Sequence, residues 1–389
     1  RMSNLYTVID FGSKNLRLGV FNQSSEIIYS SNIQIAEVLE NENLENPLKK
    51  LIRDAEKQLS THLVDVNILY DSSEFNFIEL SIKKSFDQPI LISKYYKSLV
   101  EEANFIISEN NFKDEVLHVA IDNMIVDDNR KLQTVFDNIK TKSLILELKF
   151  ICLKKSSINN LSNKFKENNL NILNIYCSSY VKSISYKKNF EKNNNLIFLD
   201  IGYQRTSALF FYDNKFQFLN SIPIGGNNIT KDISNVLKLD LNYSEDLKLK
   251  FNKDENEISF NKNSKSDINP YSELIKKNIS IDVLKQIIEA RVSEIIKLAV
   301  NQNNFVKNNI SVDKPCIIFI GSGSKLLSNN FNFDLNKDFS DLIFFKENDL
   351  KICEAGMKYH KNDERFLIKN QKKPKKTGLF EKFFNFFSK

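Results

Sequence analysis

Two aspartates of the sequence each end a short apolar run and are followed, two residues later, by a glycine. The first is Asp10, with Gly12 after it, and alternating apolar residues resume at Leu16. This pattern predicts a β-hairpin with a tight polar turn. The turn carries three side chains with hydrogen-bond donors, Ser13, Lys14 and Asn15. Because glycine lets a backbone approach closely, a phosphate suits such a turn, and Asp10 could hold a hydrated Mg²⁺. By itself, an Asp-x-Gly turn between strands is usually only a turn.

The second aspartate is Asp200, which follows the apolar run Leu196–Leu199 and precedes Gly202. It lies 190 residues after Asp10, about half the length of the 389-residue chain. An internal repeat at this distance predicts two similar halves. At this point the sequence resembles the actin-like ATPases, and the resemblance implies that each half presents its hairpin to a shared cleft.

A third glycine turn follows the second hairpin. Gly225 and Gly226 precede Asn227 and a run with helical spacing. A helix that begins here would point its first amides outward, which suits a phosphate. In the alternative, a plain helix cap, Asn227 or Asn228 satisfies these amides. Arg205, in the second hairpin itself, either supplies charge to the ligand or lies in solvent.

The fourth turn is Gly321-Ser322-Gly323, which follows the apolar run Cys316–Ile320. It resembles the adenosine-binding signature of the actin-like superfamily, although Ser322 separates two glycines that are usually adjacent. A small-residue turn at the end of a buried parallel strand is where α/β proteins bind ligands. The resemblance implies that Gly321 and Gly323 flank the adenine. It also places Glu289, on a helix expected over 280–301, near the adenosine.

Composition indicates the general class of protein. Hydrophobic residues make up 41% of the chain and charged residues 27%, the balance of an ordinary globular protein with two or three domains. The net charge of +6 does not require nucleic acid as a partner. No apolar run reaches the roughly 18 residues of a membrane-spanning helix. The four cysteines have no metal-ligand spacing and are expected to be buried, reduced thiols: Cys152, Cys177, Cys316 and Cys353.

The order of elements between the two hairpins resembles one family in particular. Helical spacing over 44–63 and strand alternation over 66–70 and 75–82 continue the first half. A helix, two strands and a second helix over 86–168 then form a small α+β insert. With an insert at this place, the sequence resembles the family of the bacterial cell-division protein FtsA. The resemblance covers nearly the whole chain and implies a two-lobed, actin-like α/β fold.

The same resemblance divides the chain into two lobes, an insert and a tail. The first lobe takes residues 1–85 and 169–195, with a return helix over 351–368, and the insert takes 86–168. The second lobe takes 196–350, with an outer subdomain over about 230–310. A lysine-rich linker over 369–377 and an amphipathic helix over 378–389 follow.

The segment 378–389 places its apolar side chains on one arc of about 160° of a helix. These side chains are Leu379, Phe380, Phe383, Phe384, Phe386 and Phe387. A core helix is the alternative, but a core helix would not follow a flexible linker rich in lysine. The segment therefore predicts an interfacial membrane anchor, and FtsA proteins end with such a helix.

The FtsA resemblance implies ATP and Mg²⁺ as ligands, with Asp10 and Asp200 holding the metal through water. Asn174 is the nearby candidate for orienting the attacking water, so hydrolysis is expected to be slow or absent. The implied partners are FtsZ, further copies of this chain in a polymer, anionic membrane lipids and, through the insert, other division proteins. The implied location is peripheral, on the cytoplasmic face of the cell membrane at the division site.

Three other actin-like classes are alternatives. A sugar kinase would need a catalytic base in the first lobe and a shaped sugar pocket, and the sequence has neither signature. The pilus-assembly ATPase PilM normally lacks the terminal amphipathic helix. A heat-shock chaperone would need a substrate-binding domain after its two lobes.

Overall fold

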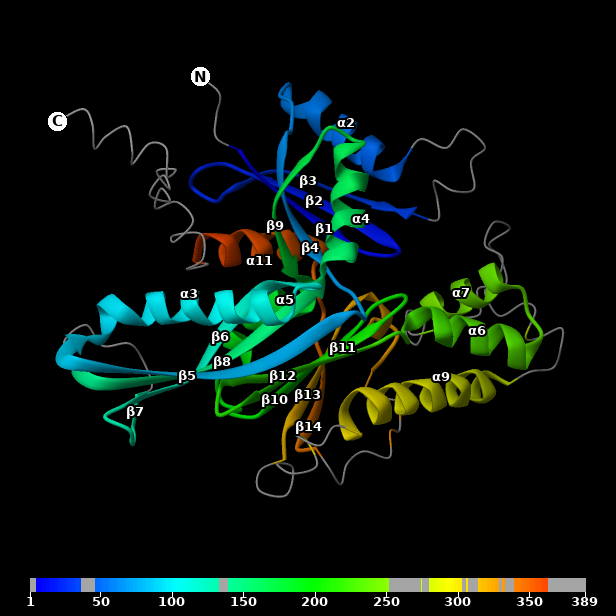
Figure 1. Ribbon diagram of the computed structural model, residues 1–389. Helices are drawn as coiled ribbons and strands as arrows, with labels where there is room; N and C mark the ends of the chain where they lie inside the picture. Colours follow the sequence, from blue (N-terminus) through cyan, green and yellow to red (C-terminus); the bar gives the residue numbers. More distant parts are fainter. Residues whose placement is uncertain are drawn as a thin grey trace.

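The computed structural model shows a mixed α/β chain built on three sheets (Figure 1). It describes residues 5–35, 46–132, 139–251, 280–302, 314–328 and 339–362, together with positions 274, 306, 331 and 333. Two of the sheets have five strands and the third has four.

The two five-stranded sheets have the same topology. The first has the order β3-β2-β1-β4-β9, and the second has the order β12-β11-β10-β13-β14. In each, three strands form an antiparallel meander and the next two run parallel to its first strand. The strands of the first sheet are β1 (Tyr6–Phe11), β2 (Asn15–Phe21), β3 (Ile27–Gln34), β4 (Asp65–Tyr70) and β9 (Asn171–Cys177). Those of the second are β10 (Leu196–Ile201), β11 (Thr206–Tyr212), β12 (Lys215–Ile222), β13 (Cys316–Ile320) and β14 (Asp341–Phe344). The repeat predicted from the two hairpins is confirmed.

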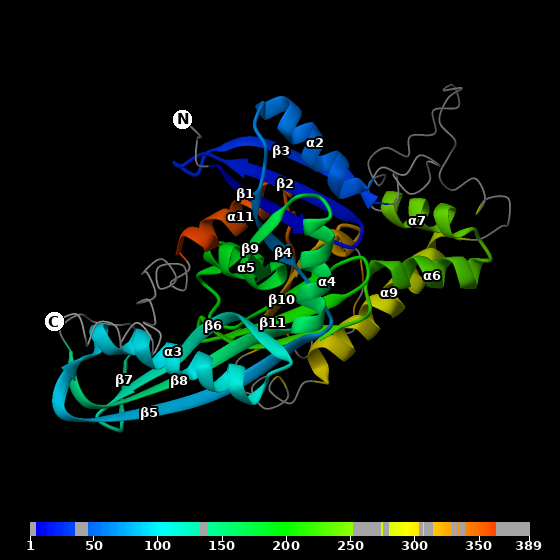
Figure 2. The ribbon, with the colours of Figure 1, turned by 45° about the horizontal axis from the view of Figure 1, so that its top comes forward.

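Helices cover both faces of each five-stranded sheet (Figures 1 and 2). α2 (Pro47–Leu59) and α4 (Lys155–Lys166) pack on one face of the first sheet. α5 (Ser178–Tyr186) and α11 (Asp349–Asn362) lie between the two sheets. α6 (Gly226–Leu237), α7 (Leu241–Lys250) and α9 (Ile281–Ile296) cover the outer face of the second sheet. Because both faces are covered, the central strands β10 and β13 are buried along their whole length.

Local sequence signals explain where these helices begin and end. At the start of α2 the side chain of Asn46 accepts a hydrogen bond from the backbone amide of Leu48, and Pro47 occupies the first turn. The helix ends at Ser60, whose backbone is left-handed with φ 51°. The predicted helix over 280–301 is present as α9 and continues as a π-helical turn, η2 (Lys297–Asn301). Short 3₁₀ turns, η1 (Lys187–Phe190) and η3 (Ser322–Ser324), follow α5 and β13.

The third sheet belongs to the insert. Its order is β5-β8-β6-β7, with β5 (Phe75–Leu91), β6 (Asp114–Val126), β7 (Arg130–Leu132) and β8 (Lys140–Lys154). α3 (Ile92–Asn110) packs on one face of this sheet, against alternate residues of β8. Those residues are Leu144, Leu146, Leu148 and Phe150.

The boundaries of the insert differ from those expected. The strand expected over 75–82 pairs with β8 and so belongs to the insert sheet, not to the first lobe. The helix expected at the end of the insert is α4, whose Leu161 and Phe165 are buried in the core of the first lobe. Alternation and helical spacing identify a strand or helix, but they do not say which sheet receives it. The insert therefore spans β5 to β8, from Phe75 to Lys154.

The predicted end of the return helix, the linker and the amphipathic helix lie beyond residue 362, outside the described residues. Residues 252–273 and 275–279, which fall within the predicted outer subdomain, lie outside the described residues too. Across the described ranges, no helix has the length and apolar character that a membrane span requires.

Gly356 marks the place where α11 packs most closely on the first sheet. A Cβ at this residue would lie 2.9 Å from Cγ1 of Val8 and 3.1 Å from Cδ1 of Leu69. We expect Gly356→Val to lower the free energy of unfolding by about 1–3 kcal/mol, because extra methyl groups overfill a packed interface. Urea denaturation followed by circular dichroism measures this. The control is Lys358→Val, since Lys358 is exposed on the same helix. Equal stability of the two variants would contradict this packing.

Candidate functional site

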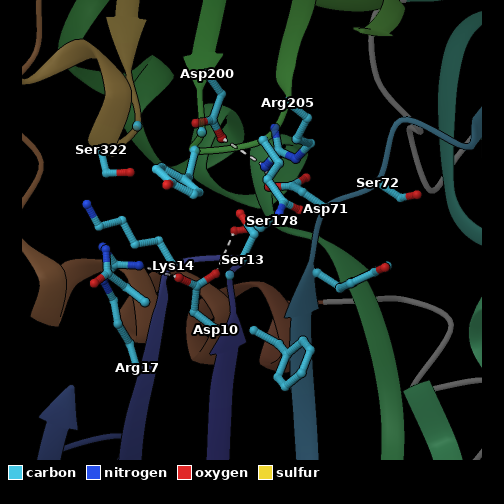
Figure 3. Close-up of a pocket in the computed structure, with 18 of the residues that line it drawn as sticks. Asp10, Ser13, Lys14, Arg17, Asp71, Ser72, Ser178, Asp200, Arg205 and Ser322 are labelled. Atoms are coloured by element: carbon cyan, nitrogen blue, oxygen red, sulfur yellow. Dashed lines mark hydrogen bonds and ion pairs between the residues drawn. The ribbon is translucent and has the colours of Figure 1, made fainter. Parts of the chain in front are cut away.

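A cavity of about 550 Å³ lies between the two lobes, where the turns of both hairpins face each other (Figure 3). The carboxyl ends of the parallel strands β1, β4 and β9 reach it from the first lobe, and those of β10 and β13 from the second. In α/β folds this edge of a sheet is where ligands bind. The volume is in the usual range of about 300–1,000 Å³ for small-ligand sites.

Most of the residues predicted from the sequence line this cavity. They are Asp10, Gly12, Ser13, Lys14, Asn15, Asp200, Gly202, Gly321 and Ser322. The two hairpin turns close in the same way, since the amide of Gly12 donates to the carbonyl of Asn15 and that of Gly202 to the carbonyl of Arg205. The sequence repeat thus becomes a structural repeat at the site.

The turn after β13 requires glycine at its first position. Gly321 has φ +91°, a backbone conformation that favours glycine. A Cβ there would lie 2.3 Å from Oδ1 of Asp200 and 2.5 Å from the carbonyl oxygen of Ile201. Gly323 does not line the cavity but backs its wall, where Gly226 packs against it. The glycines therefore bring three backbone segments together behind the site.

The start of α6 is arranged differently from the phosphate-binding prediction. The amides of Gly226 and Asn227 donate to the carbonyls of Gly202 and Tyr203, at 2.8 and 2.7 Å. The side chain of Asn228 accepts from the amide of Gly225 at 3.0 Å. The expectation that these amides point outward is therefore wrong, and the alternative of a helix cap applies. The reason is tertiary: the second hairpin supplies the acceptors.

Two further predicted residues lie away from the cavity lining. Glu289 is on α9, with its carboxylate 4.0 Å from Nζ of Lys285. Asn174, on β9, donates to the side chain of Asn67 at 2.9 Å. In this arrangement Asn174 is a polar link between β9 and β4, not a group that orients water in the cavity. Slow hydrolysis remains a prediction without a residue assigned to it.

Asp10 is buried and paired within its own hairpin. It lies opposite Arg17 across β1 and β2, and NH1 of Arg17 donates to its Oδ2 at 2.8 Å. Its Oδ1 accepts from the hydroxyl of Ser178 at 3.1 Å. Arg17 also reaches Asp349 of α11, Nε to Oδ1 at 3.0 Å. Both oxygens of the predicted metal ligand are thus already engaged.

Asp200 is buried and paired across the lobes. Nζ of Lys182, on α5, lies 2.8 Å from its Oδ2 and 3.3 Å from Oε1 of Glu347. The hydroxyl of Ser179 donates to the same Oδ2 at 2.8 Å. Burial alone would raise the pKa of Asp200, but Lys182 and Arg205 hold it below its ordinary value. Burial would likewise lower the pKa of Lys182, but Asp200 and Glu347 raise it, so its amine stays charged.

Asp71 and Arg205 form a second ion pair between the lobes. Asp71 follows β4, Arg205 closes the turn between β10 and β11, and the guanidinium contacts Oδ2 of the carboxylate (Figure 3). The amide of Ser179 donates to its Oδ1 at 3.1 Å, and the Ser179 hydroxyl, whose single proton is shared with Asp200, lies 2.9 Å from the same oxygen. Burial, with Asp200 nearby, raises the pKa of Asp71 to about 6, so it remains ionised at neutral pH.

Lys14 connects the first hairpin to the outer part of the second lobe. Its Nζ contacts Oε1 of Glu245 on α7 and lies 5.0 Å from the ring centre of Tyr203. Glu245 is also held by Lys248 at 2.6 Å. The predicted phosphate donor is therefore engaged by an acidic residue of the opposite lobe.

Sequence reasoning missed five charged residues of the cavity: Arg17, Asp71, Lys164, Lys182 and Glu347. Two of them had a usable signal. Asp71 directly follows the buried strand β4, whose end lies beside that of β1. Arg17 faces Asp10 across the hairpin. Lys182 had none, because a lysine on an amphipathic helix usually lies in solvent. The predicted burial of the four cysteines is confirmed, and all are free thiols.

Sequence comparison with known protein families matches a segment of the second lobe. The family model described as "Cell division protein FtsA" matches residues 197–332. The cell division protein FtsA of two Helicobacter pylori strains, 26695 and J99, is 26% identical over 98 residues. That match covers 25% of this chain and 20% of the length of each relative.

The fold comparison covers nearly the whole chain. A chain of a PilM–PilN type IV pilus biogenesis complex matches with a TM-score of 0.55 and 12% identity, over 90% of both chains. MreB5 of Spiroplasma citri bound to ADP matches with a TM-score of 0.50 and 11% identity, over 94% of this chain and 98% of that one. Residues 197–332 are similar to FtsA, and the chain has the actin-like ATPase fold.

The FtsA match covers only the second-lobe half of the cavity. It contains Asp200, Arg205 and the turns at Gly225 and Gly321. The first hairpin with Asp10 and the insert lie outside the matched residues 197–332. For these parts of the chain the likeness to known proteins is one of fold.

Proposed function

We propose that this FtsA-like chain binds ATP in the cavity between its lobes. One observation carries the proposal: the two repeated hairpins and the turn at Gly321 open onto one cavity of nucleotide size. The residues present fit a nucleotide. Ser13, Asn15 and Ser322 supply polar groups at its lining, and Gly321 holds a backbone conformation that leaves no room for a side chain.

The residues present do not fit Mg²⁺ as predicted. Asp10 and Asp200 were expected to hold the metal through water, but each is engaged by a cation, Arg17 and Lys182 respectively. Within the described part of the chain, no group of three or more His, Cys, Asp and Glu side chains is arranged to hold a metal ion. We therefore propose nucleotide binding without assigning a metal to either carboxylate.

The cellular role that we propose is that of an FtsA. The chain would polymerise on the inner face of the cytoplasmic membrane and tether the FtsZ ring there. The FtsA match over 197–332 and the amphipathic segment 378–389 of the sequence support this. By resemblance, FtsZ would contact the outer part of the second lobe and other division proteins the insert. The likeness to PilM is one of fold, and the amphipathic segment favours the FtsA role over a pilus role.

Equilibrium binding of a fluorescent ATP analogue tests the nucleotide site. We expect saturable binding at or below millimolar nucleotide, and we expect Ser322→Tyr to weaken it about tenfold or more, because the larger ring fills the lining of the cavity. Ser24→Tyr is the matched control, since Ser24 is exposed in the turn between β2 and β3. Absence of saturable binding to the unmodified chain, with and without magnesium, would refute the proposal.

A further inference from the structure

We propose that the ammonium group of Lys182 takes the place of a divalent cation in the cavity, so that the chain binds metal-free nucleoside triphosphate. This inference rests on the proposed nucleotide binding and concerns the form of the ligand. It would make nucleotide affinity independent of Mg²⁺.

The position of Lys182 is the first observation. The side chain reaches from α5, between the sheets, into the cavity lining, and the residue is only 5% exposed. Its Nζ lies between Oδ2 of Asp200, at 2.8 Å, and Oε1 of Glu347, at 3.3 Å. A single positive charge between two carboxylates at the carboxyl ends of parallel strands occupies the place expected for a metal ion.

The second observation is that Oδ2 of Asp200, the oxygen that faces Lys182, already has several partners. Its Oδ2 accepts from both Lys182 and Ser179, and NH2 of Arg205 lies 3.9 Å away. Its Oδ1 lies so close to Gly321 that a Cβ there would approach it to 2.3 Å. A divalent ion would have to displace a buried ammonium group, or sit beside it with like charges in contact.

Glu347 is held by a hydrogen bond through one oxygen, while the other makes only a charge contact with Lys182. Its Oε2 accepts from the backbone amide of Gly321 at 2.5 Å, while its Oε1 faces Lys182. Two acidic groups of the second lobe thus contact the ammonium group, and α5 carries the lysine from the first lobe. This arrangement is built around a monovalent cation.

The charges of the whole lining agree with this reading. Five cationic and four acidic side chains line the cavity. The cations are Lys14, Arg17, Lys164, Lys182 and Arg205, and the acids are Asp10, Asp71, Asp200 and Glu347. A ligand with a free polyphosphate would meet a lining that already carries more positive than negative groups. A metal would not be needed to cancel the charge of the carboxylates.

The test measures the affinity of a fluorescent ATP analogue in millimolar Mg²⁺ and in excess EDTA. For the unmodified chain we expect dissociation constants that agree within about twofold in the two conditions. Lys182→Met should bind about tenfold or more weakly in EDTA and recover on addition of Mg²⁺, because removal of the ammonium opens the site to a metal. Lys182→Arg, which keeps the charge, should stay independent of Mg²⁺.

Lys164→Met is the matched control, since Lys164 lines the same cavity but is exposed. It should change the affinity equally in both conditions. If the unmodified chain binds the analogue about tenfold or more tightly with Mg²⁺, the inference is wrong while nucleotide binding stands. If it binds in neither condition, the proposed function itself fails. Should Lys182→Met fail to fold, the comparison on the unmodified chain and on Lys182→Arg still decides.

Discussion

Replacing Arg205 by methionine is expected to lower the free energy of unfolding by about 3–5 kcal/mol. Arg205 pairs with Asp71 across the two lobes and lies 3.9 Å from Asp200, and the side chains of all three are at most 15% exposed. Removing the guanidinium would leave Asp71 buried with a charge balanced only by the neutral donors of Ser179 and Cys177 and by more distant cations. Breaking one side of a buried pair is costly for this reason, whatever the net worth of the intact pair.

Urea denaturation of the full chain measures this effect. The matched control is Arg53→Met, because Arg53 pairs with Asp54 on an exposed face of α2 and should contribute less than about 1 kcal/mol. A double variant, Arg205→Met with Asp71→Leu, should regain part of the loss, since it removes the uncompensated carboxylate as well. If Arg205→Met is as stable as Arg53→Met, the pair does not contribute to folding as argued.

Removal of the segment from Gly378 onward is expected to reduce binding to anionic vesicles more than about tenfold. Fully burying a Phe or Leu side chain contributes about 1.5–3 kcal/mol, and each nearby lysine adds about 1 kcal/mol. Ordering a free tail opposes this by about 1–2 kcal/mol per residue, so a single copy binds weakly. Polymerisation would align many copies and raise avidity by about 10²–10⁴-fold.

Vesicle co-sedimentation compares the intact chain, a chain ending at Thr377, and the double variant Phe383→Glu with Phe384→Glu. The control is Phe105→Glu with Phe112→Glu, which introduces the same charges at aromatic residues that are 65% and 67% exposed on the insert. The truncation at Thr377 and the double variant Phe383→Glu with Phe384→Glu should each reduce pelleting with vesicles more than about tenfold, and the control variant should not. Pelleting of the truncated chain at the level of the intact chain would show that the membrane anchor lies elsewhere or does not exist.

The sequence alone determined the two-lobed plan and most of the cavity. The paired hairpins at Asp10 and Asp200 could be recognised because strand alternation, a terminal acid and a turn glycine are local features. The repeat of this pattern at half the chain length, with the resemblance to the actin-like ATPases, also implied a shared site. The turn at Gly321 could be recognised because a small-residue turn at the end of a buried parallel strand is where α/β proteins bind ligands, and its positive φ explains why glycine stands there.

The tertiary structure decided which charges face each other. Nothing in the spacing of Lys182 distinguishes it from a solvated lysine, and only the packing of α5 between two sheets brings it to Asp200 and Glu347. The amides of Gly226 and Asn227 are used by the second hairpin, a contact between segments more than twenty residues apart. The strand at 75–82 belongs to the insert because it pairs with β8. Periodicity records which face of an element is apolar, whereas the partner of each side chain depends on how distant elements pack.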